Sequence, residues 1–172
     1  MTDFLTLAKE RYSVRSYRSV PVEQEKIDRI LEAASLAPTA RNNQPQKIYV
    51  VTGEAARKAL AEVTPCTFQA PVIFVVGYDP NRSSKGLIYE GYDFGNTDAA
   101  IVTAHMMLEA TDLGLGTCWV GYFNEDKVKK ALGLPEEVRI CNLLPAGYAA
   151  ADATPAKGHT QCRPAEEMVR FL

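Results

Sequence analysis

The stretch from Thr97 to Gly116 constrains the fold more than any other part of the chain. Read at 3.6 residues per turn, it leaves almost no polar face. Its apolar residues are Ala99, Ala100, Ile101, Val102, Ala104, Met106, Met107, Leu108, Ala110 and Leu113. A helix that is apolar nearly all round must be covered nearly all round. At about 1.5 Å per residue, this one is long enough to be the central helix of a small domain.

The ends of this helix are also marked in the sequence. Three candidate N-cap residues stand at its start: Asn96, Thr97 and Asp98. Gly114 stands where a left-handed C-terminal residue is favoured. His105, Glu109 and Asp112 interrupt the apolar run, which falls well short of the ~18 residues that a membrane span needs. We expect His105 to be a core histidine whose hydrogen bonds are satisfied.

The composition narrows the classes of function. A chain of 172 residues is the length of one domain, and we expect a single domain over 1–172. A net charge of −2 and a pI near 5.7 argue against nucleic-acid and anionic-membrane partners. The four cysteines lie far apart without metal-ligand spacing, so we expect reduced thiols and no metal. The first residues do not resemble a secretory signal, which favours a cytoplasmic protein.

The rest of the chain predicts an α+β domain. We expect helices at 3–10, after Pro21 to Ala37, at 54–63 and at 125–132, and strands at 47–52, 72–76, 117–122 and 138–148. The continuous apolar run at 72–76 is typical of a strand buried on both faces, so this strand should be central in its sheet. Asn124 can cap the helix at 125–132 and Gly133 ends it, whereas Pro145 should interrupt the last strand.

Two short polar segments are candidate ligand-binding sites. Arg11, Ser13 and Arg15 alternate, so in an extended chain they point to one side, as suits a phosphate that accepts forked N–H donors and one hydroxyl. The alternative is a solvated basic turn. Asn42 and Gln44 offer amides that match a heterocycle with donor and acceptor edges, or else form an amide-rich turn.

The glycine-rich stretch from Gly114 to Gly121 is not a dinucleotide fingerprint. It follows a helix instead of a strand, and its spacing is not G-x-G-x-x-G. It predicts a strand whose backbone at Gly121 a flat ligand can approach closely. We expect Cys118 to be a small buried hydrophobe. The loop 79–95 is long enough to be functional or mobile, and the tail 149–172 is either disordered or packed against something else.

Taken together and in order, these segments resemble the FMN-dependent nitroreductase family. The resemblance rests on the Arg11–Arg15 start, the Ala37–Pro45 loop, the Ala70–Ile73 strand, the Leu113–Gly121 segment, the Asn142–Tyr148 strand and the Arg163–Pro164 pair. It covers essentially the whole chain. It implies a mixed sheet flanked by helices around a long buried central helix. It also implies a homodimer whose tails, residues 149–172, embrace the partner subunit.

The resemblance further implies two FMN sites at the subunit interface, each built from both chains. The residues that match the family's site are Arg11, Tyr12, Ser13, Arg15, Pro38, Thr39, Ala40, Asn42, Gln44, Trp119, Val120, Gly121 and Arg163. In the family, the first segment holds the FMN phosphate, ribityl chain and pyrimidine edge, and the basic residue matching Arg163 joins at the phosphate. The loop that begins at Pro38 comes from the partner chain, and the segment 119–121 runs along the flavin.

The sequence departs from the family pattern in three places. Many members carry a basic residue where this chain has Gln161, so the phosphate site has one positive charge fewer. Larger members often have an acidic residue where this chain has Val120. They also insert helices near 79–95, which shape the substrate pocket. Substrate identity is therefore the property that transfers least.

The function implied is reduction of a small electron-poor acceptor with NAD(P)H as co-substrate, by ping-pong hydride transfer through FMN. Nitroaromatics, quinones, flavins and activated alkenes all fit. No residue is expected to act as nucleophile, because FMN carries the chemistry, and Arg15 is expected to stabilise negative charge on the reduced flavin. Two alternatives stay open: a flavin-sequestering protein with little turnover, and an FMN enzyme of the same fold with other chemistry, such as reductive dehalogenation or flavin destruction.

Overall fold

The computed structural model describes residues 3–86 and 91–172. Its elements are α1 (Phe4–Glu10), α2 (Gln24–Leu36), β1 (Gln46–Val51), α3 (Glu54–Val63), β2 (Val72–Tyr78), α4 (Gly95–Asp112), β3 (Gly116–Thr117), α5 (Glu125–Leu132), β4 (Arg139–Gly147) and α6 (Ala165–Met168), with short 3₁₀ helices at Ala40–Asn42 and Pro65–Thr67. The predicted α+β class is confirmed. None of the helices described is long and apolar enough to cross a membrane.

The four strands form one sheet in the order β1-β2-β4-β3. All three strand pairings are antiparallel, and the one parallel pairing found in the described residues is an isolated bridge between Ser13 and Thr117. The resemblance implied a mixed sheet, but the strand ladders of the described residues are antiparallel. β2 is central and buried along its whole length, as its continuous apolar run predicts.

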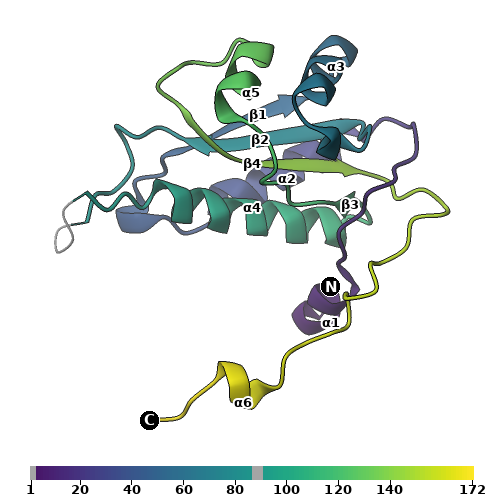
Figure 1. Ribbon diagram of the computed structural model, residues 1–172, viewed down its shortest axis with the longest axis vertical. Helices are drawn as coiled ribbons and strands as arrows, with labels where there is room; N and C mark the ends of the chain where they lie inside the picture. Colours follow the sequence, from purple (N-terminus) through teal and green to yellow (C-terminus); the bar gives the residue numbers. More distant parts are fainter. Residues whose placement is uncertain (1–2, 87–90) are drawn as a thin grey trace.

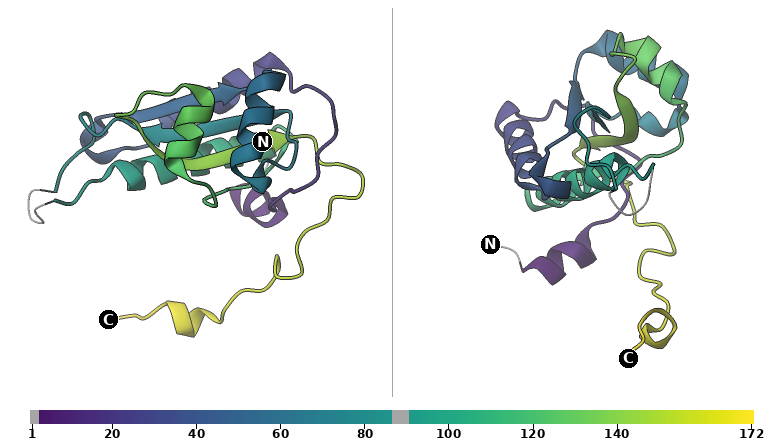
Figure 2. Two further views of the ribbon diagram at one scale, coloured as in Figure 1. Left: turned by 45° about the horizontal axis from the view of Figure 1, so that its top comes forward. Right: turned by 90° about the vertical axis from the view of Figure 1, so that its left-hand side faces the viewer.

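Helices cover both faces of this sheet (Figures 1 and 2). Because side chains alternate along β2, Phe74 packs with α2 and α4 on one face, while Ile73 and Val75 pack with α3 and α5 on the other. The amphipathic helix α2 lies along α4, and Lys26 near its start donates a hydrogen bond to the carbonyl of Leu113, 2.8 Å away. α2 and α4 therefore run antiparallel.

The central helix α4 begins two residues earlier than expected. Phe94 occupies the N-cap position, and the first helical N–H, from Gly95, bonds to the Asp93 carboxylate at 2.8 Å. None of the three predicted N-cap residues, Asn96, Thr97 and Asp98, therefore caps the helix. At the other end, Gly114 is left-handed as predicted (φ 75°). His105 is exposed, which corrects the expectation of a core histidine.

The last strand continues through Pro145, contrary to the expectation that it would be interrupted there. The carbonyl of Pro145 accepts a bond from the Cys118 N–H, at 3.2 Å, so its backbone faces the β3 side of the sheet. The missing proline N–H therefore removes a bond only toward the two-residue edge strand β3, whereas the ladder to β2 is unaffected. The expected strand at 117–122 is for the same reason reduced to β3 and a bridge between Val120 and Leu143.

The C-terminal tail leaves the body of the molecule. After Ala149 it runs away from the sheet and ends in the single turn of α6, as Figures 1 and 2 show. Its apolar side chains Met168, Val169 and Phe171 are exposed, Phe171 to 95%. The tail thus contributes nothing to the core of its own chain.

We expect Glu125→Gln to lower the free energy of unfolding by about 1–3 kcal/mol at pH 7. The Glu125 carboxylate accepts bonds from the Ile140 N–H (2.9 Å) and the Arg139 Nε (3.1 Å), and it lies 3.5 Å from the buried ammonium of Lys129. Burial raises the pKa of Glu125, but these bonds outweigh burial and hold that pKa below its usual range. The stabilisation is therefore present above the ordinary glutamate pKa and is lost as the pH falls through the lowered one.

Chemical denaturation of the parent and of the Glu125→Gln variant between pH 3 and pH 8 measures this loss of unfolding free energy. Glu54→Gln is the matched control, since the Glu54–Lys58 ion pair is exposed and should contribute well under about 1 kcal/mol. Equal losses in the two variants, or a loss independent of pH, would contradict the role given to Glu125.

Candidate functional site

The segment that carries Arg11, Ser13 and Arg15 lies along the short strand β3. The Val14 N–H donates to the Thr117 carbonyl at 2.9 Å. A side chain at Gly116 would overlap Val14, so only glycine lets the two segments approach this closely. A glycine in β3 thus positions the basic segment against the sheet.

The burial of this segment changes from residue to residue around Val14. Val14 is buried (2% exposed), whereas Ser13 before it is half-buried and Arg15 after it is exposed. Burial raises the pKa of the Cys118 thiol, and Arg15 opposes that shift, with smaller opposing effects from Ser13 and Arg11. The two guanidinium groups and the hydroxyl of Arg11, Ser13 and Arg15 alternate along this one segment, which is called the basic patch below. Cys118 is buried, as expected, and its raised pKa keeps the thiol neutral.

The predicted flavin-facing segment 119–121 divides between surface and core. Trp119 is 37% exposed, and the space around Gly121 is open, with no atom within 4 Å of the position a Cβ would take. Val120 is 4% exposed, and its N–H and carbonyl both pair with Leu143 (2.9 and 3.0 Å). Val120 therefore has no group to offer a ligand, whereas Trp119 and Gly121 form an open ledge beside the basic patch.

The loop 38–44 lies at the opposite end of α4. The Ala40 N–H donates to Asp98 in the first turn of that helix, at 2.8 Å, whereas Arg11 lines a small pocket with Gly114 beyond its last turn. Eighteen helical residues separate these ends by about 27 Å. One chain therefore does not bring the predicted residues Pro38, Thr39, Ala40, Asn42 and Gln44 together with the basic patch.

Arg163 is not brought to the patch either. The tail contacts the body as far as His159, whose ring lies 3.1 Å from the Lys9 carbonyl and edge-on to Tyr12. Tyr12 itself donates to the Ala153 carbonyl at 3.4 Å, which ties the tail to the basic segment. Beyond this point Arg163 is exposed on the extended tail. The tail thus starts beside the site and then leaves it.

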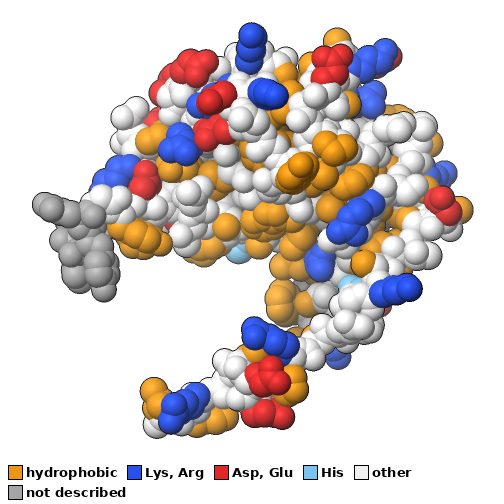
Figure 3. Space-filling model, in the orientation of Figure 1, with side chains coloured by type: hydrophobic (Ala, Val, Ile, Leu, Met, Phe, Trp, Pro, Cys, Tyr) orange, Lys and Arg blue, Asp and Glu red, His pale blue; other side chains and the backbone are white. Residues whose placement is uncertain are grey.

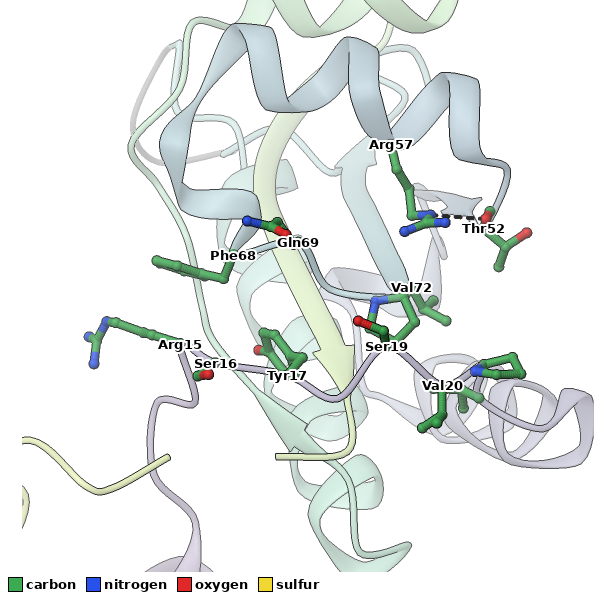
Figure 4. Close-up of a pocket in the computed structure, with 13 residues that line it drawn as sticks. Arg15, Ser16, Tyr17, Ser19, Val20, Thr52, Arg57, Phe68, Gln69 and Val72 are labelled. Carbon is green, nitrogen blue, oxygen red and sulfur yellow. Dashed lines mark hydrogen bonds between the residues drawn. The ribbon is translucent and has the colours of Figure 1, made fainter. Parts of the chain in front are cut away.

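Sequence reasoning missed two residues at the edge of the patch. Phe68 and Gln69 line an open groove of about 740 Å³ that Arg15 also lines, and Figure 4 shows the Phe68 and Arg15 side chains extending to the same side. Both residues are left-handed, with φ of 50° and 54°. Such strain in non-glycine residues collects at functional sites. The one hint in the sequence is that Pro65 and Pro71 enclose them, which is typical of a turn.

The loop 79–95 lies at the other end, with the loop 38–44. Its Asp79 N–H donates to the Pro45 carbonyl at 2.9 Å, and Lys85 pairs with Asp93 at 2.6 Å. Tyr92 is 47% exposed and packs edge-on to Phe94. The loop's middle, 87–90, lies outside the described residues. The predicted functional loop is thus adjacent to the predicted amide loop.

Comparison with known proteins places this geometry in a family. The family model described as Nitroreductase family matches residues 8–67 and 64–148. A nitroreductase family protein from Clostridium difficile 630 has the same fold, with a TM-score of 0.91 and 34% identity, over 99% of this chain and 98% of that one. A Bacillus subtilis protein named FMN reductase [NAD(P)H] is 30% identical over 168 residues, 87% of this chain and 67% of its own.

A further structure shares the fold at lower identity. It is a protein from Exiguobacterium sibiricum solved in complex with FMN, with a TM-score of 0.85 and 23% identity, covering 100% of this chain and 98% of that one. The matched regions include the basic segment, the amide loop and the Trp119–Gly121 ledge. This chain belongs to the nitroreductase family.

Proposed function

We propose that the protein is an FMN-dependent oxidoreductase that uses NAD(P)H to reduce small electron-poor acceptors. The observation that carries the proposal is the segment of Arg11, Ser13 and Arg15, held against β3 at Gly116, together with the exposed Trp119 and the open Gly121 that follow β3. The family to which the chain belongs and the FMN reductase among its relatives support it.

The donor set of the patch fits FMN. A phosphate dianion accepts forked N–H donors, which Arg11 supplies, and a hydroxyl bond, which Ser13 supplies. The open space at Gly121 admits a flat ring beside the Trp119 indole. These groups lie on one side of an extended segment, so a single elongated ligand can contact all of them.

When bound, FMN takes a hydride from NAD(P)H and passes it to an acceptor, with the two substrates using the same face in turn. The protein's part is to bind, orient and stabilise charge. Arg15 would lie at the pyrimidine side of a bound flavin, where its guanidinium would stabilise negative charge. Nitroaromatics, quinones, free flavin and activated alkenes are the acceptors that suit such chemistry.

We further propose that the active unit is a homodimer with shared sites. The two halves of the predicted site lie about 27 Å apart on one chain, and a second copy arranged antiparallel along α4 joins each half to its counterpart. Beside α4, a hollow of about 480 Å³ is lined mostly by apolar groups and is open to solvent. It is formed by Phe4, Leu7, Ala33, Ala104, His105, Leu108, Glu109 and Asp112.

The proposed homodimer would also bury this hollow and the apolar side chains of the tail. Hydrophobic side chains are exposed along the lower face of the body and on the tail (Figure 3). In the proposed dimer the second copy covers the hollow. The tail 149–172 reaches across the partner, which brings Arg163 to an FMN phosphate and buries Met168, Val169 and Phe171.

We expect the purified protein to be yellow and to carry about one FMN per chain, and anaerobic NADH or NADPH to bleach it rapidly. Absorbance at the flavin maximum, followed by stopped flow, measures both properties. Slow bleaching of a tightly bound flavin would favour the sequestering alternative. Colourless protein that takes up no FMN at micromolar concentrations would overturn the proposal.

Replacing Arg163 with Ala should weaken FMN binding by about tenfold or more, because a charge-assisted bond to phosphate contributes roughly 1.5–3 kcal/mol. Lys157→Ala is the matched control, since it removes a positive charge from the same tail at a position given no role. Gln161→Arg should tighten binding. Fluorescence titration with FMN measures all three, and an affinity of the Arg163 variant within twofold of the parent would remove the tail from the site.

Deleting residues 165–172 should lower dimer stability and FMN retention together, because one interface provides both. Sedimentation velocity at several concentrations, with flavin absorbance recorded in the same run, measures the two quantities on one sample. A truncated protein that sediments as a monomer and keeps its full FMN complement would be incompatible with shared sites.

A further inference from the structure

The loop 38–44 has an unusual backbone. Arg41, Asn42 and Gln44 are left-handed, with φ of 57°, 54° and 48°, and none of them is glycine. Non-glycine residues adopt this conformation at a cost, so something must hold them there. The residues are exposed, and core packing of their side chains does not do so.

The hydrogen bonds of this loop are mostly internal. The Asn42 and Gln44 N–H groups bond to the Thr39 carbonyl and hydroxyl (2.9 and 3.0 Å), and the Gln44 amide donates to the Asn42 oxygen (3.1 Å). Such bonds shape the loop without attaching it to the domain. In the part of the chain that the structure describes, the hydrogen bond that attaches residues 38–44 to another element runs from the Ala40 N–H to Asp98 Oδ1, at 2.8 Å.

Asp98 is placed to make this bond strong. It is 1% exposed and lies in the first turn of α4, where the helix N-terminus favours a carboxylate. A hydrogen bond to a carboxylate is about twice as strong as one between neutral groups. Its other oxygen, Oδ2, is buried without a partner among the described residues. Retaining a buried carboxylate for one bond is costly, which argues that this bond has a role beyond general stability.

We propose that Asp98 is the positioning residue of the shared site. It fixes the loop 38–44, with its left-handed residues Arg41, Asn42 and Gln44, to the rigid central helix, so that Ala40 and Asn42 meet the partner's cofactor. This inference rests on the proposed function. It adds a residue that contacts neither flavin nor acceptor and acts through the Ala40 N–H.

The test uses the full-length protein with Asp98→Ala, Asp98→Asn and, as the matched control, Thr103→Val. Thr103 lies on the same helix, is fully buried and accepts a hydrogen bond from Asn142, so its replacement removes a buried polar contact of α4 away from the loop. All measurements are made below the unfolding temperature of the least stable variant. The first readout is trypsin cleavage after the exposed Arg41, followed by mass spectrometry in excess FMN. The second is the dissociation constant for FMN.

We expect Asp98→Ala to raise both the cleavage rate at Arg41 and the FMN dissociation constant by about tenfold or more. Asp98→Asn keeps an oxygen facing Ala40. It should therefore keep most of the parent's resistance to cleavage at Arg41 and most of its affinity for FMN. For Thr103→Val, the cleavage rate at Arg41 and the FMN dissociation constant should both stay within about twofold of the parent values. At saturating FMN, kcat of the Asp98→Ala protein should return toward the parent value, because Asp98 touches no reacting atom.

Three results would overturn the inference. Unchanged cleavage at Arg41 in Asp98→Ala would show that the loop needs no such anchor. Faster cleavage with unchanged FMN affinity would show that the anchored loop serves no cofactor site. Equal losses in Asp98→Ala and Thr103→Val would show a general loss of stability. If the parent itself binds no FMN, the proposed function fails, and the cleavage rates alone then decide whether Asp98 anchors the loop.

Discussion

The structure depends on one helix, α4, that has almost no polar face. Sheet and α2 together cover most of α4, which is why Ala99, Val102, Met106 and Ala110 are inaccessible to solvent. Small side chains at 99 and 110 let neighbouring elements approach closely, and the hydrophobic effect holds them there. The side of α4 that bears His105 is left open, so a domain of this size covers its central helix incompletely.

The two groups of predicted ligand-binding residues lie at opposite ends of the same helix. The basic patch depends on a glycine in a two-residue strand just past the last turn, and the amide loop depends on a carboxylate in the first turn. Both are backbone attachments to rigid elements, which hold ligand-binding groups more precisely than mobile loops do. The two proposed halves of the site are thus each attached to the body of the domain through a residue at one end of α4.

Patterns with a local cause could be read from the sequence. The helix α5 begins at its Asn124 cap, which accepts from Lys127 at 3.0 Å, and ends at left-handed Gly133, as predicted. Features that depend on tertiary contacts could not be read from the sequence. Asp98 has the chemistry of an N-cap, and only the position of the loop 38–44 shows that its oxygen is used elsewhere. Likewise, the prolines on either side of Phe68 and Gln69 indicate a turn, but the left-handed conformation of these two residues could not be read from them.

The length of α4 has a genetic consequence in the proposed dimer. Each site takes its basic patch from one subunit and its amide loop from the other. A chain damaged at Arg15 and a chain damaged at Ala40 then form a mixed dimer in which one site carries both lesions and the other carries neither. Two inactive alleles would thus complement each other, with half the normal number of sites in every mixed dimer. The same two lesions placed on one chain would instead poison both sites of a dimer with an undamaged partner.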